Sequence, residues 1–155
     1  MFLIIIDFML LVKLFVIEIV LLFIQFTMGM INNLFIVVPL NAPFYFLSYS
    51  GGLEVLAHII NGALILVFGS LIIFFSHKTH DKLVLKLSVL AVVFAISAII
   101  NGTLFLEIFL IPKYYNIDQY FSLAMAMSFI SVFTVFFTAL YMINRQLKQT
   151  MLKTL

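Results

Sequence analysis

The residues with chemical potential in this sequence are polar side chains set inside long apolar segments. The segment EVLAHIINGALIL, residues 54–66, places Glu54, His58 and Asn61 at positions i, i+4 and i+7, on one face of a helix. A similar segment, SAIINGTLFLEI at residues 97–108, carries Asn101 followed by a glycine. A polar side chain in membrane hydrocarbon costs free energy unless it finds a partner or a cavity. These positions therefore indicate helix–helix contacts or a binding site.

The composition is typical of an integral membrane protein. Of 155 residues, 66% are hydrophobic and 9% are charged, and the mean hydropathy is +1.32. A soluble domain of this size cannot bury so many apolar residues. The sequence has no cysteine, which excludes disulfides and thiolate metal sites, and it lacks the HExxH, P-loop and nucleophile-elbow motifs. This favours a chain without independent catalytic activity, with partners in the membrane and not nucleic acid.

Four apolar segments are long enough to cross a membrane, which takes roughly 20 residues at 1.5 Å each. They cover residues 10–38, 52–76, 83–111 and 119–143, and Pro39, Pro43 and Pro112 help to delimit them. The connections between them are short. We therefore predict an all-α integral membrane protein, a single membrane domain over residues 1–155, folded as a four-transmembrane-helix up-down-up-down bundle.

The basic residues predict the orientation of this bundle. One side carries seven of the eight, and the other side carries only Lys113; the seven are Lys13, Lys78, Lys82, Lys86, Arg145, Lys148 and Lys153. By the positive-inside rule both termini should be cytoplasmic. We expect a multi-pass protein of the cell (plasma) membrane, in contact with lipids.

Counting from the predicted outer ends brings several polar residues to one depth. At 1.5 Å per residue they lie roughly 10–16 Å below the outer boundary, although antiparallel helices approach this level from opposite directions. We predict one polar layer in the outer half of the bundle, formed by Asn32, His58, Asn61, Asn101 and Ser128, with Met125 at the same level. Glu54 should lie nearer the outer water. In the first helix, Glu18, Gln25 and Asn32 recur every seven residues and form a stripe.

Two kinds of cofactor fit such a layer. The first is haem b, with His58 as the iron ligand and either Met125, Met127, a second copy of the chain or no group in the second axial position. The second is a quinone, whose head group could exchange protons with His58 and Glu54 while the Phe-rich walls accept its isoprenoid tail. Glu18 and Gln25 would extend a polar path toward the cytoplasm.

A non-catalytic role is the alternative. Hydrogen bonds between membrane helices contribute about 0.6–2 kcal/mol each and fix the helix register. His58 and the asparagines would then only hold helices together, in a purely structural accessory or transport-related protein.

The segments FIQFTMGMINNLFIVVP, EVLAHIINGALIL, AIINGTLFLE and FSLAMAMSFI resemble an uncharacterised group of small four-helix integral membrane proteins of prokaryotes, archaea included. The resemblance covers nearly the whole chain and implies a bacterial or archaeal source. It brings no activity with it. The architecture is also similar to that of single-histidine haem-b membrane subunits, although architecture does not determine function.

Together these observations predict a small membrane subunit of a larger respiratory or redox complex, or a homo-oligomer. Its polar layer around His58 would bind haem b or a quinone. The predicted cofactor contacts are Glu54, His58, Asn61, Asn101 and Met125.

Overall fold

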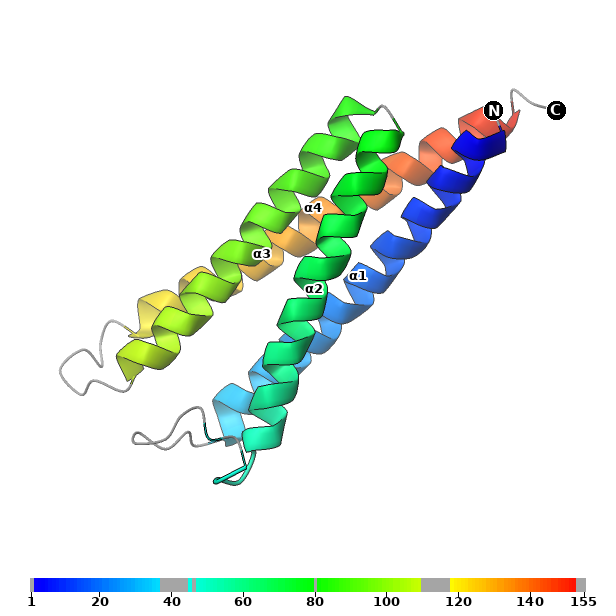
Figure 1. Ribbon diagram of the computed structural model, residues 1–155. Coiled ribbons are helices and arrows are strands. Elements are labelled where there is room, and N and C mark those ends of the chain that lie inside the picture. Colours follow the sequence, from blue (N-terminus) through cyan, green and yellow to red (C-terminus); the bar gives the residue numbers. More distant parts are fainter. Residues whose placement is uncertain (1, 37–44, 46, 80, 110–117, 153–155) are drawn as a thin grey trace.

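The computed structural model describes residues 2–36, 45, 47–79, 81–109 and 118–152. Within them the chain forms four α-helices: α1 over Phe2–Phe35, α2 over Gly52–Lys78, α3 over Lys82–Phe109 and α4 over Asp118–Leu152. Consecutive helices run antiparallel, and the two ends of the chain lie together at one end of the bundle (Figure 1). We call this the terminal end, and the opposite end, where α1 and α3 finish, the loop end.

Each helix contains a segment that is long and apolar enough to cross a membrane. These segments are Phe8–Asn32, Gly52–Lys78, Lys82–Leu104 and Tyr120–Gln149. The predicted all-α architecture with four helices of membrane-spanning length is thereby confirmed.

The helix ends differ from the predicted spans at the terminal end. The fourth span was expected to finish at residue 143, but α4 continues to Leu152. Hydropathy falls after residue 143, yet Arg, Gln, Lys and Leu are strong helix formers and no Gly or Pro intervenes. Similarly, α1 begins at Phe2, well before the predicted residue 10. The end of an apolar span and the end of a helix are therefore different boundaries in this chain.

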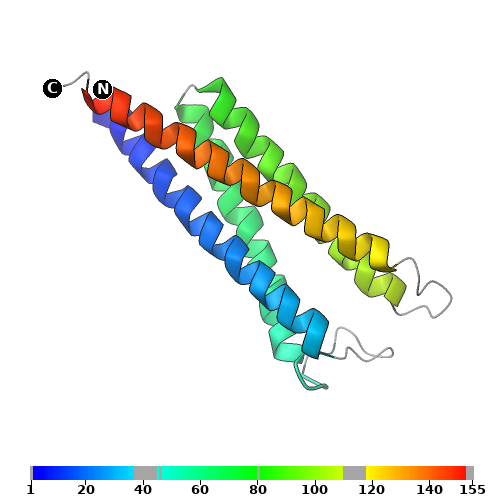
Figure 2. The same ribbon diagram turned by 180° about the vertical axis from the view of Figure 1, so that it is seen from behind.

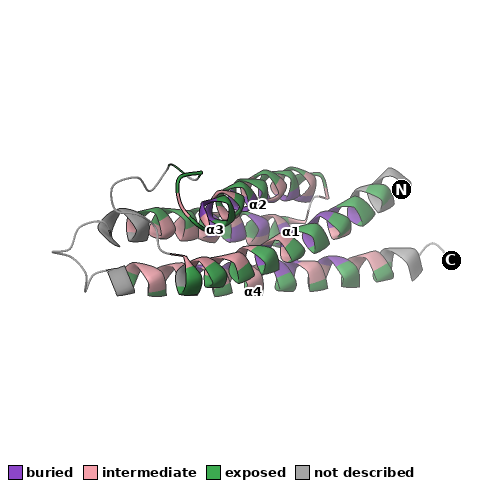
Figure 3. Cartoon of the chain, turned by 90° about the horizontal axis from the view of Figure 1, so that it is seen from below, coloured by how far each residue is buried: buried purple, intermediate pink, exposed green. Residues whose placement is uncertain are grey.

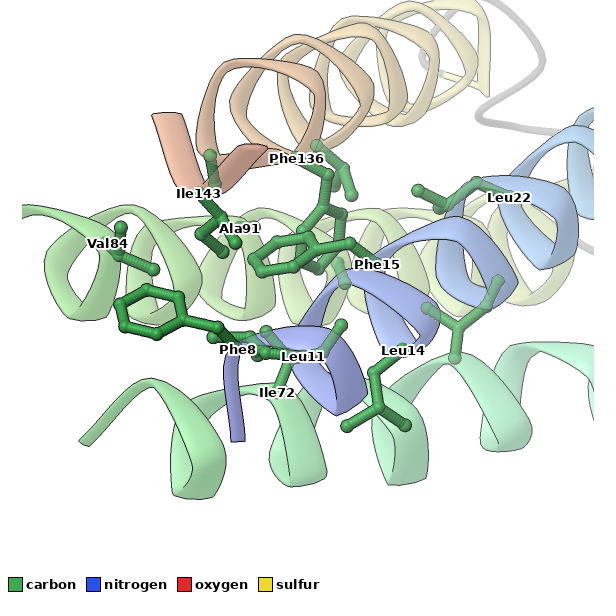
Figure 4. Close-up of a cluster of buried hydrophobic side chains, with 14 residues drawn as sticks. Phe8, Leu11, Leu14, Phe15, Leu22, Ile72, Val84, Ala91, Phe136 and Ile143 are labelled. Carbon is green, nitrogen blue, oxygen red and sulfur yellow. The ribbon is translucent and has the colours of Figure 1, made fainter. Parts of the chain in front are cut away.

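The hydrophobic core lies toward the terminal end of the bundle. Phe15 and Phe136 meet edge to face with ring centroids 5.5 Å apart, which joins α1 to α4 (Figure 4). The buried cluster comprises Phe8, Leu11, Leu14, Phe15, Leu22, Ile65, Ile72, Val84, Ala91, Ala95, Val132, Phe136, Ala139 and Ile143. Figure 3 shows that the buried positions face the inside of the bundle while the outward faces are exposed, as expected where lipid surrounds the helices.

Toward the loop end the bundle separates into two helix pairs. α1 and α4 diverge along their length (Figure 2), whereas α1 stays beside α2 and α3 stays beside α4 (Figure 1). One aromatic contact still joins the two pairs, because Phe26 of α1 stacks on Phe129 of α4 with centroids 5.3 Å apart. Val55 is the one buried hydrophobic residue in the described chain outside the core cluster. Polar contacts within each pair therefore contribute more to helix packing at the loop end than at the terminal end, where the apolar core lies.

The turn between α2 and α3 is fixed by polar contacts. Ser76 and Ser88 are fully buried and share a hydrogen bond of 2.9 Å between their hydroxyls. Asp81 caps α3, because its Oδ1 accepts hydrogen bonds from the backbone N–H groups of Leu83 at 2.8 Å and Val84 at 3.0 Å. The Gln146 side chain of α4 donates to the other carboxylate oxygen. One aspartate thus ties the start of α3 to the end of α4.

These bonds also change the acidity of Asp81. Partial burial raises the pKa of the Asp81 carboxyl, but the hydrogen bonds from Gln146, Val84 and Leu83 together outweigh it, so the pKa lies below its ordinary value. Since the folded pKa is depressed, the carboxylate stabilises the fold above its unfolded pKa of about 3.9. That contribution is lost as the pH falls through the lower, folded pKa.

We expect Asp81→Ala to lower the free energy of unfolding by about 1 kcal/mol at pH 7, because it removes the α3 cap. Asp81→Asn keeps a capping side chain and should cost less. Reversible unfolding in detergent micelles measures both. The Asp81→Ala deficit should shrink at acidic pH, and a deficit that stays constant down to the acid limit would contradict this role of the carboxylate.

Candidate functional site

α1 and α2 bring three polar side chains together in the loop-end half of the bundle. Gln25 belongs to the stripe of α1 that also holds Glu18 and Asn32, while His58 and Asn61 lie one turn apart on α2 and therefore share a face. We call Gln25, His58 and Asn61 the α1–α2 cluster.

The turn before α2 determines where along α1 the residues of this cluster lie. Gly51 precedes the helix with φ 84°, a left-handed conformation that glycine adopts without strain. A Cβ at this position would also lie 2.7 Å from Ile36 Cγ1. The turn therefore brings α2 back directly beside the end of α1, and His58 follows two turns later.

Hydrogen bonds connect the α1–α2 cluster in series. The Asn61 side-chain amide donates to the Leu21 backbone carbonyl at 3.0 Å and to Gln25 Oε1 at 2.8 Å. Gln25 Nε2 lies 3.1 Å from His58 Nε2. Asn61 is buried, and His58 and Gln25 are half-buried, so these bonds satisfy polar groups that are largely removed from solvent.

The direction of every bond in the series follows from the backbone carbonyl. A carbonyl oxygen only accepts, so the Asn61 atom facing Leu21 must be the amide nitrogen. The same nitrogen donates to Gln25, which makes the facing Gln25 atom its oxygen and turns the Gln25 amide nitrogen toward His58. His58 Nε2 must then accept, and the neutral imidazole carries its proton on Nδ1.

The proton-bearing nitrogen of His58 has no hydrogen-bond partner in the described part of the chain. Nδ1 is buried and makes no hydrogen bond to any described residue. A buried donor without an acceptor costs about 1–3 kcal/mol, so native structures retain such groups where a ligand or an ordered water completes them. The α1–α2 cluster therefore presents one buried N–H donor.

Glycines allow the two helices to approach at this level. A Cβ on Gly29 would lie 3.2 Å from His58 Cε1, and a Cβ on Gly62 would lie 3.4 Å from Gln25 Nε2. The imidazole thus rests against the α1 backbone, and the amide of Gln25 rests against the α2 backbone. Small residues at such contacts are typical of packed membrane helices.

A second polar cluster lies between α3 and α4. The hydroxyls of Ser97 and Ser128 are 3.2 Å apart, and Asn101 donates to the Ser97 carbonyl at 2.8 Å and to the Ser97 hydroxyl at 3.3 Å. Met125 packs beside Gly102, where a Cβ would lie 3.2 Å from its Sδ. Ser97, Asn101 and Ser128 form the α3–α4 cluster.

The structure divides the predicted layer between the two helix pairs. His58 and Asn61 lie in the α1–α2 cluster, whereas Asn101 and Ser128 lie in the α3–α4 cluster, and no described hydrogen bond joins the two. Asn32 is half-buried, and its Oδ1 has no partner among the described residues. Of the predicted cofactor contacts, Glu54 is exposed and Met125 packs on the α3–α4 side.

Two residues of these clusters, Gln25 and Ser97, were in neither the predicted layer nor the predicted cofactor contacts, and the same holds for Gly29 beside His58. Gln25 sets the orientation of His58, Gly29 supports the ring, and Ser97 joins α3 to α4. The seven-residue spacing of Glu18, Gln25 and Asn32 was the signal for Gln25, because it places the amide on the same stripe as Asn32.

The metal-binding capacity of these residues is limited. No group of three or more His, Asp or Glu side chains lies together in the described part of the chain, which contains no Cys. A haem iron would need the lone pair of an imidazole nitrogen, and the Nε2 lone pair of His58 is engaged by Gln25. Iron ligation therefore requires Gln25 to release the ring.

We expect Asn61→Ala to destabilise the fold more than Asn101→Ala. The first substitution removes both bonds from Asn61 to α1 and leaves Gln25 Oε1 without its donor, for a loss of about 1–2 kcal/mol. The second removes bonds made within α3 only, so we expect about 0.5 kcal/mol or less. Unfolding by dodecyl sulfate in mixed micelles measures the difference, and equal losses would contradict the assignment.

No protein family, curated protein or solved structure matches this chain.

Proposed function

We propose that this chain is an integral membrane protein whose α1–α2 cluster binds the head group of an isoprenoid quinone, as a subunit of a larger respiratory or redox assembly. The observation that carries the proposal is the buried Nδ1 of His58, which has no described partner. The series from Leu21 through Asn61 and Gln25 makes this nitrogen a donor. A quinone carbonyl is an acceptor that suits it.

The tautomer of His58 also favours a quinone over haem b. Haem takes an imidazole lone pair, whereas the ring in this arrangement offers a proton. A quinone takes a proton donor at its carbonyl and needs no metal ligand. His58 is also neutral in this arrangement, so it can donate a hydrogen bond without a buried charge.

A second unpartnered atom matches the reduced form of the ligand. Asn32 Oδ1 is buried without a described partner, and Asn32 follows Gln25 by seven residues on the same stripe of α1. A quinol carries hydroxyl donors where the quinone has carbonyl acceptors. A donor at His58 and an acceptor at Asn32 thus offer partners for both oxidation states.

The chain also offers an apolar surface of the right kind for an isoprenoid tail. A groove of about 370 Å³ lies between α1 and α4, lined by Phe23, Phe26, Phe129, Ile130, Phe133 and Thr134. Phe26 lies beside Gln25 in the sequence, so the groove and the α1–α2 cluster share one level of α1. Ligand sites of this kind combine apolar walls with a few polar groups.

We further propose that both termini are cytoplasmic and that the protein lies in the plasma membrane. Lys78, Lys82, Lys86, Arg145 and Lys148 all lie at the terminal end of the helices, and the positive-inside rule places this end in the cytoplasm. The His58 site would then open toward the outer half of the membrane.

A purely structural role is the second candidate, because Asn61 and Gln25 do join α1 to α2. Such a role uses the Nε2 side of His58, which contacts Gln25. The quinone proposal uses the Nδ1 side. The two sides of one imidazole therefore separate the two hypotheses.

We expect His58→Gln to weaken binding of a short-chain quinone about fivefold, since one neutral hydrogen bond contributes about 1 kcal/mol. The longer glutamine reaches the position of Nε2 and can keep the contact with Gln25, but it loses the Nδ1 donor. His58→Asn places an amide nitrogen near the position of Nδ1 and should retain binding while losing stability. Quinone titration of the protein in nanodiscs gives both affinities.

Ser76→Ala provides the control for this experiment, because Ser76 is a buried polar residue of α2 that lies eighteen residues from His58, about 27 Å along the helix. The affinity of the Ser76→Ala variant for quinone should equal that of the original chain. Equal affinity in His58→Gln would instead leave only the structural role. A Soret absorption band in the purified protein that disappears in both His58 variants would favour haem.

The orientation is testable with single cysteines, since the chain has none of its own. Ser48→Cys and Gln149→Cys change exposed residues at opposite ends of the bundle. We expect a membrane-impermeant maleimide to label the first variant in intact cells and the second only after lysis. Labelling of Gln149→Cys from outside would reverse the proposed orientation.

A further inference from the structure

An acidic side chain without a partner among the described residues lies within the hydrophobic core. Glu18 of α1 is fully buried, with 0% of its surface exposed. Neither carboxyl oxygen has a hydrogen-bond partner among the described residues. The quinone site does not include Glu18, which precedes Gln25 by seven residues, about 10 Å along α1.

Apolar groups surround this carboxyl. On α1 it continues the buried stripe formed by Leu11, Phe15 and Leu22; Figure 4 shows these three side chains within the core. Across the interface lies Gly69 of α2, where a Cβ would be 3.6 Å from Glu18 Oε1 and 2.8 Å from Val92 Cγ2 of α3. Glu18 therefore lies at the junction of α1, α2 and α3, where its carboxyl approaches Gly69 and the absent Cβ of this glycine leaves room for Val92.

No described titratable group faces Glu18 from the helices around it. On α1, Lys13 is exposed and points to the opposite face, five residues away. On α2, His58 is held by Gln25 in the other half of the bundle. The remaining charged or titratable side chains of α2 and α3 near the terminal end are exposed, namely His77, Lys78, Lys82 and Lys86. Between Tyr120 and Tyr141, α4 has no titratable residue.

An ionised carboxylate is not stable in this environment. An isolated charge without a counter-ion or hydrogen-bond donors costs so much free energy in an apolar interior that the group neutralises instead. Ionisable residues at such positions in membrane proteins are rare and mark proton or ion pathways. A glutamine or leucine would fill the same space without this cost.

We propose that Glu18 is a reversible proton-binding site at the centre of the membrane. At rest the carboxyl is a neutral acid. When water reaches the junction of α1, α2 and α3, the O–H bond breaks, its electron pair stays on the carboxylate, and the proton passes to a water oxygen. Reversal of this step reloads the site.

The chemistry of the surroundings selects a proton over a metal cation. Sodium, calcium and magnesium require several oxygen ligands around the ion. Glu18 supplies two oxygens, and its described neighbours at the junction, Gly69 and Val92, supply no polar side chain. A proton needs one oxygen only. Glu18 lies outside the α1–α2 cluster, so this proton site is independent of whether that cluster binds a quinone.

Dicyclohexylcarbodiimide tests the proposal on the whole protein in detergent micelles. This apolar reagent reacts with protonated carboxyls in apolar surroundings, and the intact mass followed by peptide mapping identifies the modified residue. At neutral pH we expect Glu18 to be labelled. Glu18→Gln, which keeps the shape of the side chain without an acid, should lose the label completely. Glu54→Gln is the matched control, because Glu54 is exposed on α2, and it should retain the label.

Infrared spectroscopy of the unlabelled protein supplies a second measurement that does not depend on a variant being stable at high concentration. The carbonyl band of a neutral carboxylic acid should be present at neutral pH and should shift on transfer to D₂O, which shows that the proton exchanges. Absence of both the label and this band would overturn the proposal. So would a band that never shifts in D₂O, because the acid would then be permanently locked. Protection of Glu18 from the reagent by Na⁺ would overturn it in favour of a cation site.

Discussion

The hydrogen bond from Asn61 to the Leu21 carbonyl fixes the direction of the remaining bonds between α1 and α2. A backbone carbonyl cannot reverse its role, whereas each side-chain amide and the imidazole could adopt either of two orientations. Because the series begins at a carbonyl, the orientation of Asn61 determines that of Gln25, and Gln25 determines the tautomer of His58. The chemistry available at Nδ1 is therefore set three hydrogen bonds away, on the backbone of α1.

Many other polar side chains of the spans form their hydrogen bonds within their own helix. Each of the following donates a hydrogen bond to the carbonyl four residues earlier: Thr27, Ser70, Thr103, Ser131, Thr134 and Thr138. This short-range bond lets a hydroxyl face lipid without a partner on another helix. A polar group that cannot use it must find a neighbour. Among the described residues, the buried side-chain atoms without a partner belong to Glu18, Asn32 and His58, so these three residues are the candidates for binding a ligand or a proton.

The sequence determines depth in this protein better than it determines contacts. Apolar length and short connections predicted the four helices, because hydrocarbon thickness and backbone hydrogen bonding leave few other solutions. Counting along the helices placed His58, Asn61, Asn101 and Ser128 at one level. It could not assign them to separate helix pairs, because that depends on the rotation of each helix and on where the bundle opens. The continuation of α4 beyond residue 143 was missed because hydropathy indicates which residues favour the membrane interior. It does not indicate where the backbone stops being helical, which depends on helix propensity.

The distribution of unsatisfied groups also distinguishes the two helix pairs. Glu18 and Asn32 lie on α1 and His58 lies on α2, whereas no buried side-chain polar atom in the described parts of α3 and α4 lacks a partner. In the α3–α4 cluster, Ser97, Asn101 and Ser128 complete one another. Polar groups that serve only to hold helices together should be satisfied in this way, since an unsatisfied buried group lowers stability. α3 and α4 therefore have the properties expected of helices that only stabilise the bundle. α1 and α2 carry the unpartnered polar groups that a ligand or a proton would use.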